Sequence, residues 1–167
     1  MPSPLVFLDL DGVLNPFAAP ACPDGYAEQV CFDGEGPVRY CRAHAGWVRE
    51  LAAAAELWWA TGWGEHANTR FPPLLGVPPL PVVRLPAVPF EPELKVPAVA
   101  AVAGERPAAW IDDHHTPAGR RWAAARAAPT LLVPVDPAVG WTRADVDAVL
   151  TWVSGPAAGP ARPVSRW

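Results

Sequence analysis

Four aspartates in two short clusters are the residues of this chain best suited to chemistry. Asp9 and Asp11 come at the end of the first apolar run, and Asp112-Asp113 follow a later one. Carboxylates that converge on one crevice repel one another strongly unless a cation lies among them. An all-oxygen ligand set with open positions suits Mg²⁺, which keeps several of its waters and pairs with phosphate oxygens. The two clusters therefore predict a magnesium site that handles phosphate.

Further residues have the chemistry to act on a phosphoryl group. Thr61 offers a hydroxyl and Gly62 an unobstructed amide after another apolar run. Lys95 is the single lysine among 13 basic residues, and its compact ammonium would neutralise charge on a transferring phosphoryl group. Only one residue separates Asp9 from Asp11, so one can attack while the other serves as general acid and base. These residue types are suited to phosphoryl transfer.

These side chains must be brought together by the elements around them. Short apolar runs predict strands at residues 5–10, 57–60, 108–111 and 130–135, with a short further strand around Val82-Val83. Helices are predicted over residues 42–55, 64–75, 93–102, 117–127 and 142–153. Strands that alternate with helices imply an α/β fold with a parallel sheet and helices on both faces. Ligands bind such sheets beyond the carboxyl ends of the strands, where the aspartates and Thr61 fall.

Local signals refine these elements. Thr116-Pro117 and Thr142 are expected to begin the last two helices, with Asp145 in the first turn of the final one. Pro72-Pro73 are expected to cut short the helix at residues 64–75. Residues 15–28 predict an irregular loop and residues 29–41 a hairpin with strands at 30–32 and 38–40.

The motifs and their order resemble those of the haloacid dehalogenase (HAD) superfamily. Asp9-Leu10-Asp11-Gly12-Val13-Leu14 looks like its first motif, and Thr61, Lys95 and Asp112-Asp113 fall where its second, third and fourth motifs should. The resemblance spans residues 5 to about 135. It implies a three-layer, Rossmann-like HAD core.

A closer resemblance is to the small HAD domains of bacterial proteins and of Swiss-army-knife RNA repair proteins. It is carried by Asp11-Gly12-Val13-Leu14-Asn15-Pro16, Trp59-Ala60-Thr61-Gly62-Trp63 and Trp110-Ile111-Asp112-Asp113. The RNA-repair description refers to domain neighbours of some members, and we expect no such neighbour within these 167 residues.

The resemblance implies a role for each motif residue. Asp9 would be the nucleophile that forms an aspartyl-phosphate, and Asp11 would protonate the leaving oxygen and then activate water. Mg²⁺ would be held by the Asp9 carboxylate, the Asp11 carbonyl and Asp112, with Asp113 helping directly or through water. Phosphate binding would fall to Gly12, Thr61, Gly62 and Lys95. Dehalogenase members need no acid at the position of Asp11, so the resemblance favours a phosphatase.

Trp63 and His66, which follow the phosphate-binding threonine, are candidate pocket residues. Trp63 could stack on a base or sugar, and His66 could serve as a second acid or substrate ligand. For Trp63, an incidental place in the core or at the rim is the alternative, since the chain has nine tryptophans.

Two further clusters have both a functional and a structural interpretation. A Cys₃His zinc site would use Cys22, Cys31, Cys41 and His44, but their wide spacings favour free thiols packed in the hairpin instead. Arg120, Arg121 and Arg126 on one helix would meet an anionic substrate or form a solvated face.

The segments available for a cap are short. We expect a HAD-like domain at residues 1–153, with residues 15–41 forming a loop-and-hairpin flap, and a disordered tail at 154–167. Residues 64–94 add equally little, so the site should be nearly capless. An open site favours bulky substrates such as nucleic-acid ends or phosphoproteins, or requires a lid from a partner or a second copy.

Composition limits the class of protein. The 167 residues are 51% hydrophobic with a net charge of −4, which predicts one folded domain and gives nucleic-acid binding no support. The first apolar run breaks at Asp9 and no stretch is long enough to span a bilayer, so a soluble, cytoplasmic protein is expected. The predicted function is a Mg²⁺-dependent phosphatase acting on a small ester, a nucleic-acid end or a phosphoprotein. A phosphotransferase and a non-catalytic phosphate- or Mg²⁺-binding module remain the alternatives.

Overall fold

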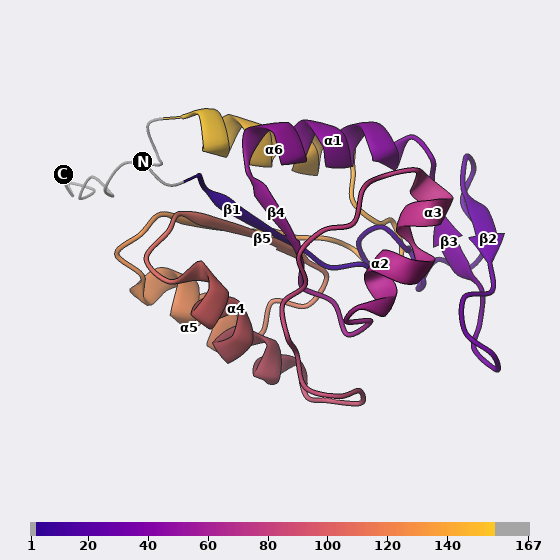
Figure 1. The fold of residues 1–167 in the computed structure, drawn as a ribbon, viewed down its shortest axis with the longest axis horizontal. Helices are drawn as coiled ribbons and strands as arrows, with labels where there is room; N and C mark the ends of the chain where they lie inside the picture. Colours follow the sequence, from indigo (N-terminus) through magenta and orange to yellow (C-terminus); the bar gives the residue numbers. More distant parts are fainter. Residues whose placement is uncertain (1–2, 156–167) are drawn as a thin grey trace.

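Four parallel strands form the central sheet of the computed structural model, which describes residues 3–155 (Figure 1). Their order across the sheet is β4-β1-β5-β6. The strands are β1 (Leu5–Leu8), β4 (Glu56–Trp59), β5 (Ala108–Asp112) and β6 (Thr130–Pro134). The predicted parallel α/β core is confirmed, and each predicted strand of the sheet lies within about two residues of its observed bounds.

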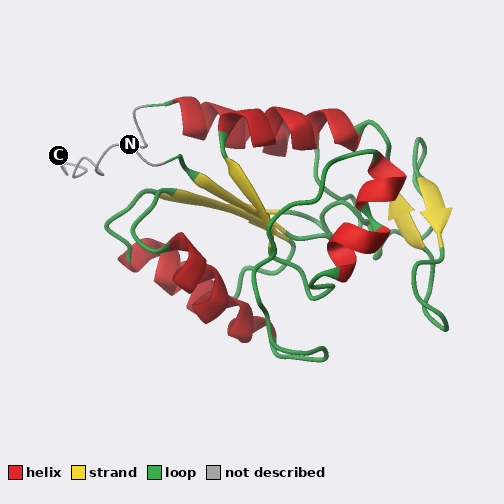
Figure 2. Ribbon diagram, viewed as in Figure 1, coloured by secondary structure: helices red, strands yellow, loops and turns green. Residues whose placement is uncertain are grey.

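Helices cover both faces of this sheet. On one face lie α1 (His44–Ala54) and α6 (Arg143–Ser154), and on the other lie α4 (Lys95–Ala103) and α5 (Pro117–Ala125) (Figures 1 and 2). Strand β1 is buried throughout, because Val6 and Leu8 pack into one apolar cluster while Leu5 and Phe7 pack into the other. A strand buried on both faces needs a continuous apolar run, which is the pattern that predicted it.

The short elements gather at the carboxyl end of the sheet (Figure 2). They are β2 (Ala27–Gln29), β3 (Val38–Tyr40), α2 (His66–Arg70), α3 (Pro72–Leu75) and the 3₁₀ turn η1 (Pro92–Leu94). No larger insertion occurs within residues 3–155, which fits a minimal cap.

The predicted hairpin exists, but its first strand was placed too late. Strand β2 pairs antiparallel with β3 through Gln29 opposite Val38, whereas residues 30–37 form the β2–β3 loop. The reason is tertiary packing, since Cys31 is buried and Phe32 packs edge-to-face on Trp63 with ring centroids 4.8 Å apart. These contacts draw the apolar residues of the loop away from the ladder.

Two proline-rich segments also differ from expectation. Residues 64–75 form two short helices, because Pro72 begins α3 at a position where its missing N–H needs no intrahelical partner. The strand expected around Val82-Val83 is reduced to a single bridge between Trp59 and Val82. The 3₁₀ turn η1 occupies residues 92–94, so the helix predicted from residue 93 begins at Lys95.

Both predicted helix caps are confirmed. The Thr116 hydroxyl accepts from the Gly119 N–H at 3.2 Å. Thr142 and Asp145 form a reciprocal capping box at the start of α6, in which each side chain accepts from the backbone N–H of the other. The tail predicted as disordered begins at Ser154, the last residue of α6, and its residues 156–167 lie outside the described residues.

The capping box predicts a measurable share of the stability of α6. Replacing Thr142 with Ala removes the acceptor for the Asp145 N–H and should lower the free energy of unfolding by about 1 kcal/mol. Urea denaturation measures this change. Thr151→Ala, the same substitution at an exposed position within the same helix, should change it by less than about 0.5 kcal/mol. Equal effects of the two substitutions would contradict the capping role.

Candidate active site

Strand pairing places two aspartates side by side at the carboxyl edge of the sheet. Leu8 of β1 lies opposite Ile111 of β5, so the next residues, Asp9 and Asp112, are neighbours. Both are buried, with Asp9 5% exposed and Asp112 fully covered. Two carboxylates that lie this close together and are shielded from solvent require a cation between or beside them.

Lys95 supplies that cation from the first residue of α4. Its Nζ donates to Asp9 Oδ2 at 2.5 Å and to Asp112 Oδ2 at 2.8 Å. Burial raises the pKa of Asp9 to about 7, with Lys95 acting against this and Asp112 adding to it. Burial also acts to lower the pKa of Lys95, but Asp9 and Asp112 outweigh it and raise that pKa above its usual value. The three charges therefore form one coupled unit.

A third carboxylate completes an acid cluster that fits a divalent cation. Ligand oxygens of Asp9, Asp112 and Asp113 lie within 4.8 Å of one another. Burial, and then the charge of Asp112, raise the pKa of Asp113. One ammonium does not balance three carboxylates, and carboxylate oxygens are the ligands that Mg²⁺ prefers. The residues present thus match the donor set expected for the predicted ion.

Gly12 allows the chain to turn tightly beneath this cluster. Its φ is 78°, and a Cβ at this position would overlap the carboxyl group of Asp113. The turn is closed by backbone bonds, among them one from the Gly12 N–H to the Asn15 carbonyl at 2.8 Å. Both the left-handed backbone and the close approach to Asp113 require glycine at this position.

The carboxylate of Asp11 points away from the acid cluster. One of its oxygens accepts from Asn15 Nδ2 and the other from Trp63 Nε1, both at 2.7 Å. Asn15 in turn accepts from the backbone N–H of Arg39 at 3.0 Å, which ties this arrangement to β3. A metal contact of Asp11 would therefore have to use its backbone carbonyl, as the family resemblance implies.

Sequence reasoning missed these two partners of Asp11. The sequence predicts Trp63 as a stacking residue, yet its indole N–H donates to Asp11. Asn15 has no predicted role, although it is 4% exposed and directly follows the first motif. A polar asparagine within an otherwise apolar stretch just after an acidic motif was the available signal.

A cavity of about 320 Å³ opens over the acid cluster. It is lined by Gly62, Val88, Pro89, Phe90, Pro92, Lys95, Asp112, Asp113 and His114. Gly62 follows β4 together with Thr61, which is 1% exposed, and a Cβ on Gly62 would lie 3.1 Å from Val88. The predicted phosphate-binding threonine, glycine and lysine thus come from β4 and α4 to the edge where the aspartates lie.

His66 is located away from this cavity. Its ring is exposed and packs edge-to-face on Phe32 with centroids 5.7 Å apart. It is not among the described residues that line this cavity or the separate cavity beside Asp11.

The zinc alternative is not supported within residues 3–155. Cys22 is exposed and Cys31 is buried, and the cysteines do not gather with His44 into a ligand group. His44 instead stacks on Trp47 with ring centroids 4.6 Å apart, and burial lowers its pKa to about 4.

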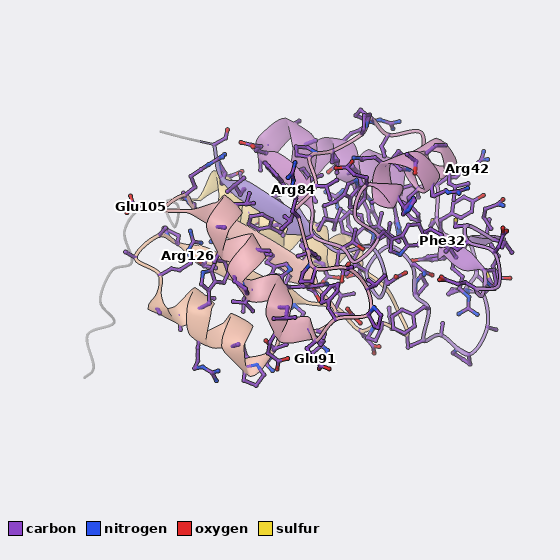
Figure 3. All side chains as sticks on the ribbon, turned by 60° about the horizontal axis from the view of Figure 1, so that its bottom comes forward. Phe32, Arg42, Arg84, Glu91, Glu105 and Arg126 are labelled. Carbon is purple, nitrogen blue, oxygen red and sulfur yellow. The ribbon has the colours of Figure 1, made fainter. Side chains whose placement is uncertain are left out.

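The arginines predicted to share one helix separate in the structure. Arg120 and Arg121 are exposed on α5, whereas Arg126 follows the helix and donates to backbone oxygens of Gly104 and Arg106. Figure 3 shows Arg126 at the opposite end of the molecule from Phe32 and the β2–β3 loop. Arg126 therefore binds backbone carbonyls beyond the end of α5, and the prediction that it shares a helix with Arg120 and Arg121 was wrong.

Comparison with known families agrees with this geometry. The family described as "HAD domain in Swiss Army Knife RNA repair proteins" matches residues 5–146. The chain belongs to this family. No curated protein and no solved structure matches it. Membership makes the protein a HAD domain of the general hydrolase and phosphatase type.

None of the helices of this HAD domain within residues 3–155 has the length and apolar character needed to cross a membrane.

The close approach of Gly12 to Asp113 predicts an unusually costly substitution in the HAD domain. Gly25 has a similar φ of 82°, but a Cβ added there would have no neighbouring atom within 4 Å. Gly25→Ala should therefore cost only the backbone strain, about 1–2 kcal/mol. Gly12→Ala should cost roughly 1–3 kcal/mol more, because its Cβ also collides with Asp113. Urea unfolding of both variants measures the difference, and equal losses would contradict the close approach.

Proposed function

We propose that this protein is a Mg²⁺-dependent phosphatase that hydrolyses phosphate monoesters through an aspartyl-phosphate on Asp9. The observation that carries the proposal is the environment of the Asp9 carboxylate. Oδ1 accepts from the Leu10 N–H at 2.7 Å and Oδ2 accepts from Lys95. The nucleophile is thus held rigidly within the cluster it forms with Asp112 and Asp113.

The proposed reaction has two steps. In the first, an oxygen of Asp9 attacks phosphorus, the bond from phosphorus to the ester oxygen breaks, and Asp11 donates a proton to the departing alcohol. In the second, Asp11 takes a proton from water, whose oxygen attacks the aspartyl-phosphate and releases inorganic phosphate and the free Asp9 carboxylate. Lys95, Thr61 and Gly62 would hold the phosphoryl oxygens in both steps.

Mg²⁺ would be held by Asp9, Asp112, Asp113 and the carbonyl of Asp11. When bound it supplies positive charge that offsets both the clustered carboxylates and the phosphoryl oxygens. Lys95 already bridges Asp9 and Asp112, so this chain neutralises part of the same charge with its own residue.

The position of Asp11 separates this proposal from a non-catalytic binding module. A module that only bound phosphate or Mg²⁺ would have no need of a carboxylate held by Asn15 and Trp63 outside the acid cluster. A phosphotransferase would use the same first step and pass the phosphoryl group to an acceptor other than water.

The three free cysteines fit a reducing compartment such as the cytoplasm, where we place the reaction.

Loss of the nucleophile should abolish turnover. Asp9→Asn should lower the hydrolysis of p-nitrophenyl phosphate with Mg²⁺ by on the order of 10³-fold or more, because no aspartyl-phosphate can form. Chelation of Mg²⁺ should reduce wild-type release to a similar level. Asp147→Asn, a matched change on the exposed face of α6, should leave the rate within about twofold. Retained turnover in Asp9→Asn would contradict the nucleophile assignment.

Trp63 should act by positioning Asp11. Trp63→Phe keeps an aromatic ring but removes the N–H that donates to Asp11. A general acid matters most for a poor leaving group, so hydrolysis of an alkyl phosphate should fall by roughly 10- to 100-fold. Hydrolysis of dinitrophenyl phosphate, whose leaving group needs no proton, should fall by less than about threefold in its first step.

Single-turnover measurements with both substrates make this comparison. Trp47→Phe, a matched change in the aromatic cluster around His44, should affect neither substrate. Equal losses on the two substrates for Trp63→Phe would show a general structural role instead.

A further inference from the structure

A second cavity, of about 450 Å³, lies beside Asp11 and shares no lining residue with the cavity over the acid cluster. Its wall runs from the first-motif loop to the β2–β3 loop. The wall residues used below are Asp11, Phe17, Glu35, Pro37, Arg39 and Trp63.

We propose that this cavity binds the alcohol half of the phosphate ester, and that it selects an uncharged, ring-bearing alcohol of about nucleoside size over one that carries a further phosphate. The inference rests on the proposed phosphatase function and specifies its substrate class.

The position of Asp11 assigns the cavity to the alcohol. A general acid must lie within hydrogen-bond reach of the oxygen that it protonates. Asp11 is turned away from Asp9 and Lys95 toward Asn15 and Trp63, and it lines this cavity. The group attached to the leaving oxygen therefore extends on the Asp11 side, whereas the phosphoryl group lies on the side of Asp9.

The charges of the wall disfavour a second phosphate. Arg39 is the only cationic residue among the described residues of the wall, and its guanidinium is already committed. It donates to Glu28 at 3.0 Å and to the backbone carbonyls of Pro16 and Ala19 at 3.2 and 2.7 Å. Asp11 and Glu35 remain, so an additional phosphate would face carboxylates.

The apolar part of the wall fits a ring. Phe17 is 54% exposed at this cavity, which leaves much of its ring free to contact a ligand. Pro37 and Trp63 add further apolar surface, and Trp63 is fixed by edge-to-face contacts with Phe32 and Phe71. Most of the rest of the wall is polar, so a ligand in this cavity of a few hundred Å³ would meet both ring surface and hydrogen-bonding groups.

Three substrates test the assignment. Acetyl phosphate reports the chemistry without a ring, a nucleoside monophosphate fills the proposed subsite, and the matching nucleoside bisphosphate adds one phosphate. We expect kcat/KM for the monophosphate to exceed that for the bisphosphate by about tenfold. Glu35→Gln should narrow this ratio by roughly threefold or more, because it removes a facing charge. Asp33→Asn, an acid of the same loop outside the wall, should leave the ratio unchanged.

The apolar contact is tested separately. Phe17→Ala should raise KM for the monophosphate by roughly fivefold and leave acetyl phosphate turnover unchanged. Val30→Ala, at another exposed apolar residue outside the wall, should change neither.

The outcomes distinguish the two proposals. Acetyl phosphate turnover with equal kcat/KM for the two nucleotides, and no effect of Phe17→Ala, would overturn the subsite and leave the phosphatase standing. No turnover of acetyl phosphate or of either nucleotide by folded, Mg²⁺-supplemented protein would overturn the phosphatase and the subsite together.

Discussion

Lys95 bridges two buried carboxylates that the sheet itself forces together. The parallel register of β1 and β5 leaves Asp9 beside Asp112, and neither can move away without breaking that pairing. Two carboxylates deprived of water are tolerated only with a cation within reach. Helix α4 must therefore begin where its first side chain can reach both, as Lys95 does at 2.5 and 2.8 Å. Because Asp113 adds a third carboxylate, the charge balance favours a further cation, which in our proposal is Mg²⁺.

A single tight turn separates the surroundings of the two acids in the first motif. Asp9 contacts Lys95 within the acid cluster, whereas Asp11 contacts Asn15 and Trp63 and lines the second cavity. This opposite orientation depends on Gly12, which lets the chain reverse in direct contact with Asp113. A nucleophile and a proton donor that act on opposite ends of one phosphorus–oxygen bond need such a separation. The geometry thus supports the different roles that we propose for two acids so near in sequence.

The parts of the structure that follow from local patterns could be predicted from the sequence. Continuous apolar runs identified the strands and cap residues located two helix starts, while the family resemblance placed Lys95 with the acids. The β2–β3 register was missed because Phe32 leaves the ladder to pack on Trp63, a contact distant in sequence. The hydrogen bond from Trp63 to Asp11 was missed for the same reason, since these two residues lie 52 positions apart. Long-range packing decides such details, and residue spacing does not encode it.

The two sites that we propose, for the phosphoryl group and for the alcohol, occupy separate parts of this fold. The acid cluster, Thr61 and Lys95 follow strand ends or begin a helix, where the sheet fixes them rigidly. Most of the wall of the second cavity comes from the flap at residues 15–41. The Asn15 side chain links this flap to the first motif, because it contacts both Asp11 and the backbone of Arg39. Loops change more readily than the elements that they connect. On this proposal, changes in the flap would alter the alcohol that the domain accepts while the phosphoryl site stays intact, provided that Asn15 continues to hold Asp11 between the two.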